Sequence, residues 1–337
     1  MSSLNWRRRL VRGAAFALAL GTAAAALTAC GSDSGSGASG SSGGSGNGAA
    51  GTLPKTLVFS PLSLAPPALK GLSEGVKGYA GSKGWDVIVQ DPNFDPTKQT
   101  QQLNEVLSSG RAGAAWVIAV APKSMGPILK TAQSKGIPLL VNGRPDEYGF
   151  DGPQPGVTFD YIDYVAGGKA LGEQLGKCIT EKLGGTAKVF FAVSAEGQAG
   201  KKEFETAAID ALKTAAPGAT IVQTVVAKDR AQSQTDIGNA LQGKPDVAAV
   251  MASNDEGALG AVGAFAAAKK NLACVTDFGG NDEVLQAVKD GKIYASVALQ
   301  FQADMAQSFD TLVKMQANPK SNGEVLVVPQ KVVTAAG

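Results

Sequence analysis

The chain has 337 residues, 44% of them apolar and 18% charged, so it is long enough for two domains with cores of ordinary size. It contains no histidine, which removes the commonest general base at neutral pH and the commonest metal ligand. Its 31 basic residues nearly balance its 29 acidic ones, which does not provide the basic surface that nucleic-acid binding requires. We therefore expect neither an enzyme nor a metal, cofactor or nucleic-acid partner.

The first 52 residues are predicted to be a targeting segment and a tether. Four arginines between residues 7 and 12 precede an apolar run over residues 14–27, which is too short for a comfortable membrane span. The run ends in LTACG at residues 27–31, which resembles the bacterial lipobox, in which the cysteine is lipidated after cleavage. An ordinary signal peptide with an incidental cysteine is the alternative. We predict a lipoprotein signal peptide over 1–30, lipidation at Cys30 and a Gly/Ser-rich tether over 31–52 that cannot order itself.

The part of the chain after residue 30 is slightly acidic and carries two further cysteines. The leader holds four arginines and no acid, so 27 basic residues remain against 29 acidic ones, a net charge of −2. In an oxidising compartment Cys178 and Cys274 are expected to pair, although two separate buried thiols are the alternative because sequence does not test the geometry of a bond. In either state we expect them to be structural.

From residue 53 onward, short and largely continuous apolar runs alternate with helical stretches. The predicted strands are 57–60, 85–90, 114–120, 138–142, 187–193, 220–226, 247–252, 273–278 and 293–299. The predicted helices are 66–82, 96–109, 124–135, 164–182, 199–215, 232–241, 255–268, 282–289 and 303–317. Helix starts are marked by Asp95 before Pro96 and by the caps Asn254 and Asn281. This alternation predicts an α/β fold with parallel sheets. Two sheets of about five strands each, separated by the Pro/Gly-rich stretch 144–156, fit better than the alternative of one sheet of nine or ten strands.

Several segments then match one family. Residues 246–261, DVAAVMASNDEGALGA, closely match the strand, loop and helix pattern of the type I periplasmic binding proteins, in their ribose-binding, LacI-like branch. Weaker matches are KGIP at 135–138, residues 163–169, FGG at 278–280 and residues 288–293. The resemblance covers residues 55–337. A LacI-type repressor is excluded because the N-terminus is a secretion signal and not a DNA-binding headpiece.

The resemblance implies two doubly wound parallel-sheet lobes joined by a three-strand hinge. Crossings are expected near 159–163, 300–302 and 322–325. The N-terminal lobe then comprises 53–159 plus 302–322, and the C-terminal lobe 160–301 plus 323–337. Ligand is expected between the lobes at the carboxyl ends of the strands.

Arginine placement adds an argument from the residues themselves. After the leader the only arginines are Arg111, Arg144 and Arg230, and the last two follow predicted strands. The guanidinium offers a rigid fork of donors for hydroxyl or carboxylate oxygens. Arg144 matches a family ligand contact and Arg230 lies near one; a surface or hinge ion pair is the alternative for both, for Arg144 with Asp146 or Glu147.

Further ligand contacts are assigned from the resemblance. Asn254 matches a family contact and is also a helix cap, two roles that are compatible. Its neighbour Asp255 is expected to interact with the helix dipole. The remaining candidates are weaker, because an ordinary role in a turn, in the hinge or at a solvent-exposed helix start is the alternative to ligand contact. They are Ser63, Leu64, Asn142, Lys201, Asn281 and Gln300.

Four sugar-gripping features of the family are absent. The loop after the first strand, residues 60–67, has no aromatic residue. Family acids are replaced by Gly143 and Gly279, and an aromatic residue by Lys228. Because carboxylates are missing while cations are kept, we hypothesise a less sugar-like ligand that carries oxygen acceptors or a negative charge.

Together these features predict an extracytoplasmic binding lipoprotein on the outer face of the cell membrane. It is expected to be a monomer that closes on a small polar ligand, a sugar or another oxygen-rich molecule, and delivers it to the permease of an ABC importer. A ligand-sensing co-receptor for a membrane sensor is the main alternative, and an enzyme on this fold is a remote one.

Overall fold

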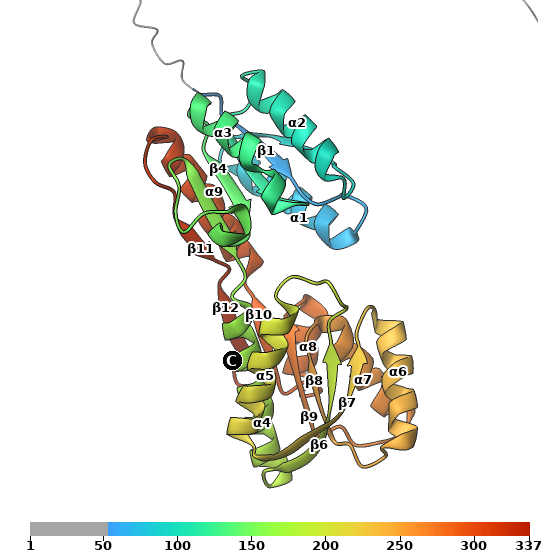
Figure 1. The fold of residues 1–337 in the computed structure, drawn as a ribbon. Helices are drawn as coiled ribbons and strands as arrows, with labels where there is room; N and C mark the ends of the chain where they lie inside the picture. Colours follow the sequence, from blue (N-terminus) through green and yellow to red (C-terminus); the bar gives the residue numbers. More distant parts are fainter. Residues whose placement is uncertain (1–52) are drawn as a thin grey trace, which may run out of the picture. The chain divides into compact units, whose positions relative to one another are not determined.

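The computed structural model describes residues 53–337, which form two sheets flanked by helices (Figure 1). The predicted leader, the tether and Cys30 lie outside these residues. The first sheet has the order β11-β5-β4-β3-β1-β2, and all its pairs are parallel. Its strands are β1 (Thr56–Ser60), β2 (Asp86–Val89), β3 (Ala114–Ile118), β4 (Leu139–Asn142), β5 (Val157–Tyr161) and β11 (Val325–Val327).

The second sheet has the order β12-β10-β9-β8-β6-β7. This is the same topology, with β6 to β10 in the places of β1 to β5 and β12 in the place of β11. β12 runs antiparallel to β10, and the other pairs are parallel. The strands are β6 (Thr186–Val193), β7 (Gly218–Val226), β8 (Ala249–Ala252), β9 (Cys274–Gly279), β10 (Ala295–Leu299) and β12 (Gln330–Thr334). β9 therefore holds the same place in the second sheet as β4 in the first.

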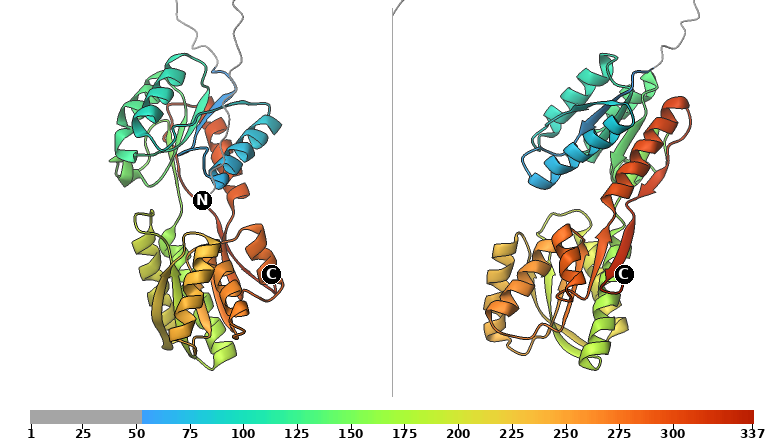
Figure 2. Two further views of the ribbon diagram at one scale, coloured as in Figure 1. Left: turned by 90° about the vertical axis from the view of Figure 1, so that its right-hand side faces the viewer. Right: turned by 180° about the vertical axis from the view of Figure 1, so that it is seen from behind.

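Helices connect successive strands of both sheets (Figure 2). They are α1 (Pro67–Ser82), α2 (Pro96–Ser108), α3 (Gly126–Lys135), α4 (Tyr164–Leu183), α5 (Lys201–Ala215), α6 (Arg230–Gly243), α7 (Asp255–Ala267), α8 (Asp282–Lys289) and α9 (Phe301–Ala317), with short 3-10 turns η1 (Pro122–Ser124) and η2 (Pro145–Tyr148). The predicted caps are in place, because Asp95, Asn254 and Asn281 each accept a backbone N–H from the first turn of their helix.

Each sheet has helices on both faces. Along β1, Val58 packs with α2 and α3, whereas Leu57 and Phe59 pack with α1 and α9. Along β6, Phe190 packs with α6, α7 and α8, and Phe191 packs with α4 and α5. Because both faces are covered, these strands are continuous apolar runs rather than alternating ones. The α/β class and the two doubly wound lobes are as predicted.

Three segments within residues 53–337 connect the two sheets. They are residues 162–163 after β5, Gln300 between β10 and α9, and residues 328–329 between β11 and β12. The prediction that 323–337 belongs to the second lobe, with a crossing near 322–325, is wrong because Val325–Val327 pairs with β5 in the first sheet. The first lobe also extends to Tyr161 rather than to residue 159. The N–H of Gln300 donates to the carbonyl of Pro329 at 2.8 Å, so the second and third connections lie side by side.

Helices α4 and α5 pack unusually closely. Gly168, Gly172 and Gly176 recur every fourth residue on one side of α4, and a Cβ added at Gly172 would lie 2.1 Å from the carbonyl oxygen of Ala208 in α5. Only glycine permits this approach of one backbone to the other. The contact brings the first turns of both helices together at one edge of the second sheet.

A disulfide ties α4 to the second sheet. Cys178 of α4 is bonded to Cys274 at the start of β9, with the two Cα atoms 5.8 Å apart, and both residues are fully buried. This is the paired state that the sequence analysis favoured.

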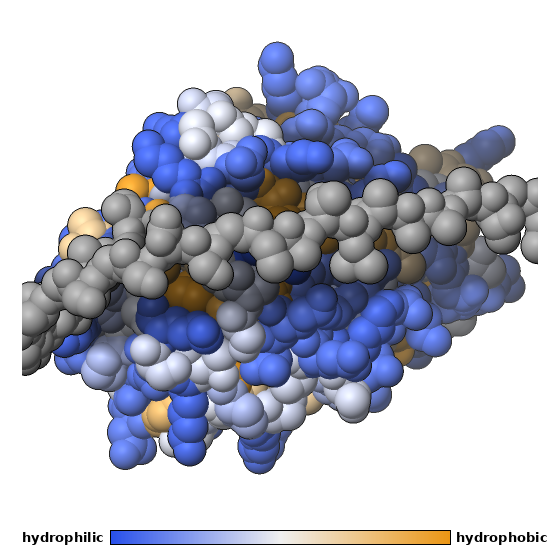
Figure 3. Space-filling view, turned by 90° about the horizontal axis from the view of Figure 1, so that it is seen from above, coloured by the Kyte–Doolittle hydropathy of each residue, from blue (hydrophilic) through white to orange (hydrophobic). Residues whose placement is uncertain are grey.

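The apolar character of the described part of the chain is seen in its helices and on one of its faces. None of the helices in residues 53–337 is both long and apolar enough to cross a bilayer. On the face seen in Figure 3, hydrophilic side chains dominate and apolar ones form small, separate patches.

Candidate ligand-binding site

A pocket of about 440 Å³ lies at the carboxyl ends of four strands of the second sheet. Ser194 follows β6, Ser253 follows β8, Gly279 ends β9 and Leu299 ends β10. Carboxyl ends of parallel strands meet at one edge of a sheet, where ligands of open α/β folds bind. The other lining residues are Ile162, Tyr164, Gln198, Ala199, Gly200, Lys201, Phe204, Asn254, Asp255, Phe278 and Phe301.

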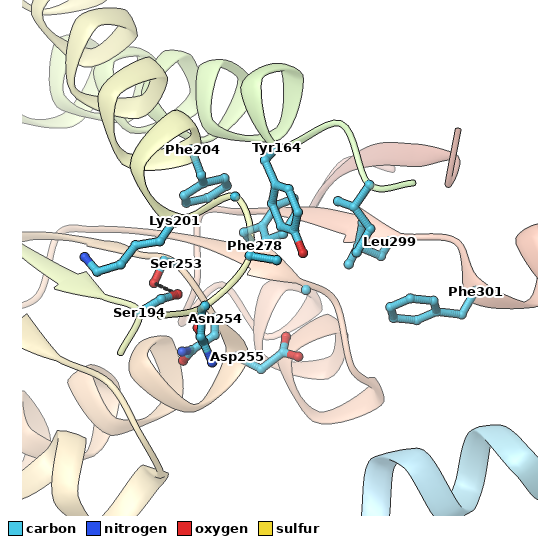
Figure 4. Close-up of a pocket in the computed structure, with 15 residues that line it drawn as sticks. Tyr164, Ser194, Lys201, Phe204, Ser253, Asn254, Asp255, Phe278, Leu299 and Phe301 are labelled. Carbon is cyan, nitrogen blue, oxygen red and sulfur yellow. Dashed lines mark hydrogen bonds between the residues drawn. The ribbon is translucent and has the colours of Figure 1, made fainter. Parts of the chain in front are cut away.

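Aromatic rings form one side of the pocket (Figure 4). Phe278 packs against Phe204, with ring centroids 4.7 Å apart, and lies 6.4 Å from the ring of Tyr164. The ring of Tyr164 packs directly on Gly200, where an added Cβ would lie 2.0 Å from the ring, so glycine leaves room for it. Phe301, at the start of α9, is half exposed and lies apart from these rings, on the side of Leu299 (Figure 4). Such a surface suits the apolar face of a ring-shaped solute.

Neutral polar groups line the other side. The hydroxyls of Ser194 and Ser253 lie 3.0 Å apart. The Oδ1 atom of Asn254 accepts the N–H of Gly257 at 2.8 Å, and its Nδ2 donates to the carbonyl of Ala227 at 2.9 Å. An amide has two N–H donors, so one remains for a ligand. Asn254 thus serves as a cap and also lies in the pocket, as the sequence analysis anticipated.

The charges of the pocket come from Lys201 and Asp255. The Nζ atom of Lys201 lies 2.6 Å from Glu205 and 3.4 Å from Glu196, and it points away from the aromatic rings (Figure 4). Burial raises the pKa of the Asp255 carboxyl, although the N–H groups of Asn281 and Gly280 oppose this by stabilising the charged form.

In the first lobe, Ser63 and Leu64 form a closed turn after β1. The buried Ser63 hydroxyl accepts the N–H of Ala65 at 3.1 Å, and the N–H of Leu64 donates to Asp91 at 3.1 Å. Residues 60–67 contain no aromatic residue, so this loop supplies no ring to a ligand.

The other two candidates in the first lobe, Asn142 and Arg144, interact with residues of the same lobe. Asn142 accepts the Nε1–H of Trp116 at 2.7 Å and donates to Asp160 at 3.0 Å. Arg144 is exposed, pairs with Asp146 at 3.2 Å and lies over the ring of Tyr161. This is the ion pair that was the alternative to ligand contact.

The remaining candidates lie outside the pocket lining. Arg230 joins the starts of three helices by pairing with Glu256 at 3.1 Å and Glu283 at 2.8 Å. Asn281 caps α8, and the Nε2 of Gln300 donates to the carbonyl of Ala298 at 3.2 Å. Of the nine predicted contacts, Lys201 and Asn254 line the pocket.

The expectation of an acidic ligand rested on the cations that the chain keeps. Lys201, Arg144 and Arg230 each have a carboxylate partner. The sequence analysis also missed the rings of Tyr164, Phe204, Phe278 and Phe301. Their shared signal is an aromatic residue within about four positions of a predicted strand end or helix start, whereas aromatic residues were sought only after the first strand and at position 228.

Comparisons with known proteins agree with this fold. The family model described as "periplasmic binding protein domain" matches residues 58–320. The ribose import binding protein RbsB of Bacillus subtilis is 30% identical over 249 residues, which cover 73% of this chain and 76% of that protein.

Solved structures show the same architecture. A periplasmic solute-binding protein of an ABC transporter from Actinobacillus succinogenes, with bound D-allose, aligns with a TM-score of 0.69 and 19% identity over 84% of this chain and 98% of its own. The myo-inositol binding protein of Caulobacter aligns with a TM-score of 0.66 and 21% identity over 84% of this chain and 94% of its own. At these identities the likeness concerns the fold.

Proposed function

The chain belongs to the type I periplasmic binding proteins, in the ribose-binding branch, and from this premise we propose that it captures a small neutral polyol or sugar outside the cytoplasm and delivers it to an ABC permease. The observation that carries the proposal is the pocket at the carboxyl ends of the second sheet, with aromatic rings on one side and hydroxyl and amide groups on the other. A ring with an apolar face and a hydroxylated edge fits both sides.

The mechanism proposed is hinge closure. The pocket borders two of the connections between the sheets, at Ile162 and at Leu299 and Phe301. A solute that contacts both lobes binds the closed state more tightly and shifts the population towards it. The permease then recognises the closed protein.

Attachment to the outer face of the cell membrane through Cys30 is part of the proposal. Its support is the sequence of the leader and the Gly/Ser-rich composition of residues 31–52. Metabolic labelling with a fatty acid tests it: the wild-type protein should incorporate label and partition with the membrane, and Cys30→Ser should do neither.

Ligand binding is tested by thermal unfolding of residues 53–337 with D-ribose, D-allose, myo-inositol and, as an acidic probe, D-ribonate. A neutral probe at 100 times its Kd should stabilise the folded protein by about 2.7 kcal/mol. Mass spectrometry should identify the same chemical class in material that co-purifies.

A matched pair of helix-capping residues tests whether the ligand that stabilises the protein binds in this pocket. Asn254 and Asn281 each accept the N–H of the third residue after them at 2.8 Å, but Asn254 alone of the two lines the pocket. Aspartate preserves the cap. Asn254→Asp should therefore abolish most of the stabilisation by the neutral probe and Asn281→Asp should retain it; equal effects, or stabilisation by D-ribonate alone, would contradict the proposal.

A further inference from the structure

A carboxylate occupies the space that a side chain at the end of β9 would fill. Gly279 has φ +146°, and a Cβ built on it would lie 2.6–2.8 Å from the carboxyl atoms of Asp255. Asp255 is the first residue of α7, which follows the neighbouring strand β8. The absence of a side chain at 279 thus admits the carboxylate of Asp255 to the strand end.

The Asp255 carboxylate is held by one of its oxygens. Its Oδ1 atom accepts the N–H groups of Gly280 at 2.7 Å and Asn281 at 3.1 Å. These bonds need a left-handed turn after β9, which Gly280 provides with φ +83°. Carboxylate oxygens have about four lone-pair sites in total, so acceptor capacity remains on the side that lines the pocket.

A second acid, Asp277, neighbours Asp255. Asp277 is fully buried, one of its oxygens accepts the hydroxyl of Ser296 at 2.7 Å, and the other has no donor partner. Burial and the neighbouring Asp255 raise the pKa of Asp277 well above its usual value. Burial thus favours the protonated form of Asp277, whereas the two backbone N–H groups that Asp255 accepts favour the charged form of Asp255.

The same replacement occurs at the matching place of the first sheet. Gly143 directly follows β4, has φ +129°, and a Cβ on it would lie 2.6 Å from Oε2 of Glu147. β4 and β9 hold equivalent places in the two sheets. Two glycines at equivalent strand ends thus each have a carboxylate from another residue over them.

We propose that Asp255 is the specificity-determining residue of the pocket, accepting hydrogen bonds from ligand hydroxyls and repelling acidic solutes. The proposal rests on the proposed function. With Lys201 paired to Glu205 and directed away (Figure 4), the charge that a ligand meets on this side is negative. The hydroxyl of Tyr164 faces the same open space as the Asp255 carboxylate, so a hydroxylated ring between them contacts both (Figure 4).

The test compares two aspartates in the same local sequence. Asp255 and Asp282 each follow a capping asparagine and begin a helix in an Asn-Asp-Glu segment, but Asp282 is exposed and outside the pocket. Calorimetric titration with D-ribose, D-allose and myo-inositol should show affinity reduced about 10- to 100-fold in Asp255→Asn, as expected for a lost hydrogen bond to a charged group, and unchanged in Asp282→Asn. Asp255→Asn should also reduce the ratio between the affinity for the neutral probes and the affinity for D-ribonate.

A second variant moves the carboxylate while keeping it. Gly279→Ala places a methyl group where the Asp255 carboxylate lies and should reduce affinity like Asp255→Asn. Gly149→Ala is the control for backbone strain, because Gly149 has φ +84° with nothing within 4 Å of an added Cβ. If Asp255→Asn fails to fold, Gly279→Ala decides.

The outcomes separate this inference from the proposed function. Unchanged affinity for a neutral probe in folded Asp255→Asn overturns the role of Asp255 and leaves sugar binding intact. Tighter wild-type binding of D-ribonate than of every neutral probe also overturns it. If the wild-type protein binds none of the neutral probes, the proposed ligand class is wrong and the inference falls with it.

Discussion

At the scale of single residues, the first lobe contains a second buried acid pair, beside the connections between the sheets. Asp160 of β5 is fully buried and accepts the amide of Asn142 at 3.0 Å. It lies near Asp304 and Ser308 of α9, and Asp304 itself accepts from Gln307 at 2.8 Å. Burial, with the negative charge of Asp304 second, raises the pKa of Asp160 to about 8. The pair therefore retains a proton over most of the physiological range.

This pair predicts a fall in stability with rising pH. An unfolded Asp160 loses its proton near pH 4, whereas the folded one keeps it until about pH 8, so the folded state binds more protons in between and stability decreases across that window. Asp160→Asn keeps the acceptor for Asn142 and removes the titration. Thermal unfolding should show Asp160→Asn more stable than wild type at pH 8.5, with the difference closing towards pH 4. The exposed Asp310→Asn should follow wild type; a constant difference at all pH values would refute the prediction.

The site residues show why sequence reasoning identified part of the pocket. Asn254 was found because its cap role and its motif are local in sequence. Arg230 pairs with Glu256 and with Glu283, 26 and 53 residues later, and nothing local indicates that these ion pairs form. In the same way, a glycine at 279 suggested a lost acid, whereas the structure places the carboxylate of Asp255 over it. A carboxylate that is supplied by a different position of the chain cannot be detected when sequences are compared position by position.

At the scale of elements, the predicted strands and helices agree with most of the observed ones, and the misses have one cause. β5, β11 and β12 were not predicted as strands. Polar residues interrupt β5, β11 has three residues, and β12 is an edge strand that includes Gln330 and Lys331. They form because the neighbouring strands offer unpaired backbone groups, which is a tertiary effect.

The close contact between α4 and α5 predicts that Gly→Ala substitutions change stability in opposite directions inside and outside this contact. In an open helical position Gly→Ala stabilises by up to about 1 kcal/mol. Gly172→Ala instead places a methyl group 2.1 Å from the backbone of α5, so it should destabilise by about 1–3 kcal/mol or more. Gly78→Ala in α1, with nothing within 4 Å, should be stabilising. Urea unfolding measures both; a Gly172→Ala protein as stable as wild type would show that the helices separate freely.

At the scale of the whole molecule, the disulfide constrains a large part of the second lobe. Cys178 and Cys274 are 96 residues apart, and the segment between them includes β6, α5, β7, α6, β8 and α7. A bond that closes so long a loop removes much conformational freedom from the unfolded chain.

Removal of this bond should therefore reduce stability substantially. We expect the double variant Cys178→Ala, Cys274→Ala to lose about 2–5 kcal/mol of unfolding free energy, measured in urea. A reductant should lower the stability of the wild-type protein and leave that of the double variant unchanged. Equal sensitivity of both proteins to the reductant would contradict a structural role for the bond.

The placement of β11 and β12 has a consequence for how the protein matures. Each sheet takes an edge strand from residues 325–334, although the other strands of the first sheet all lie before residue 162. During synthesis, neither sheet can pair all its strands before β11 and β12 have been made, so the two sheets are completed at nearly the same time.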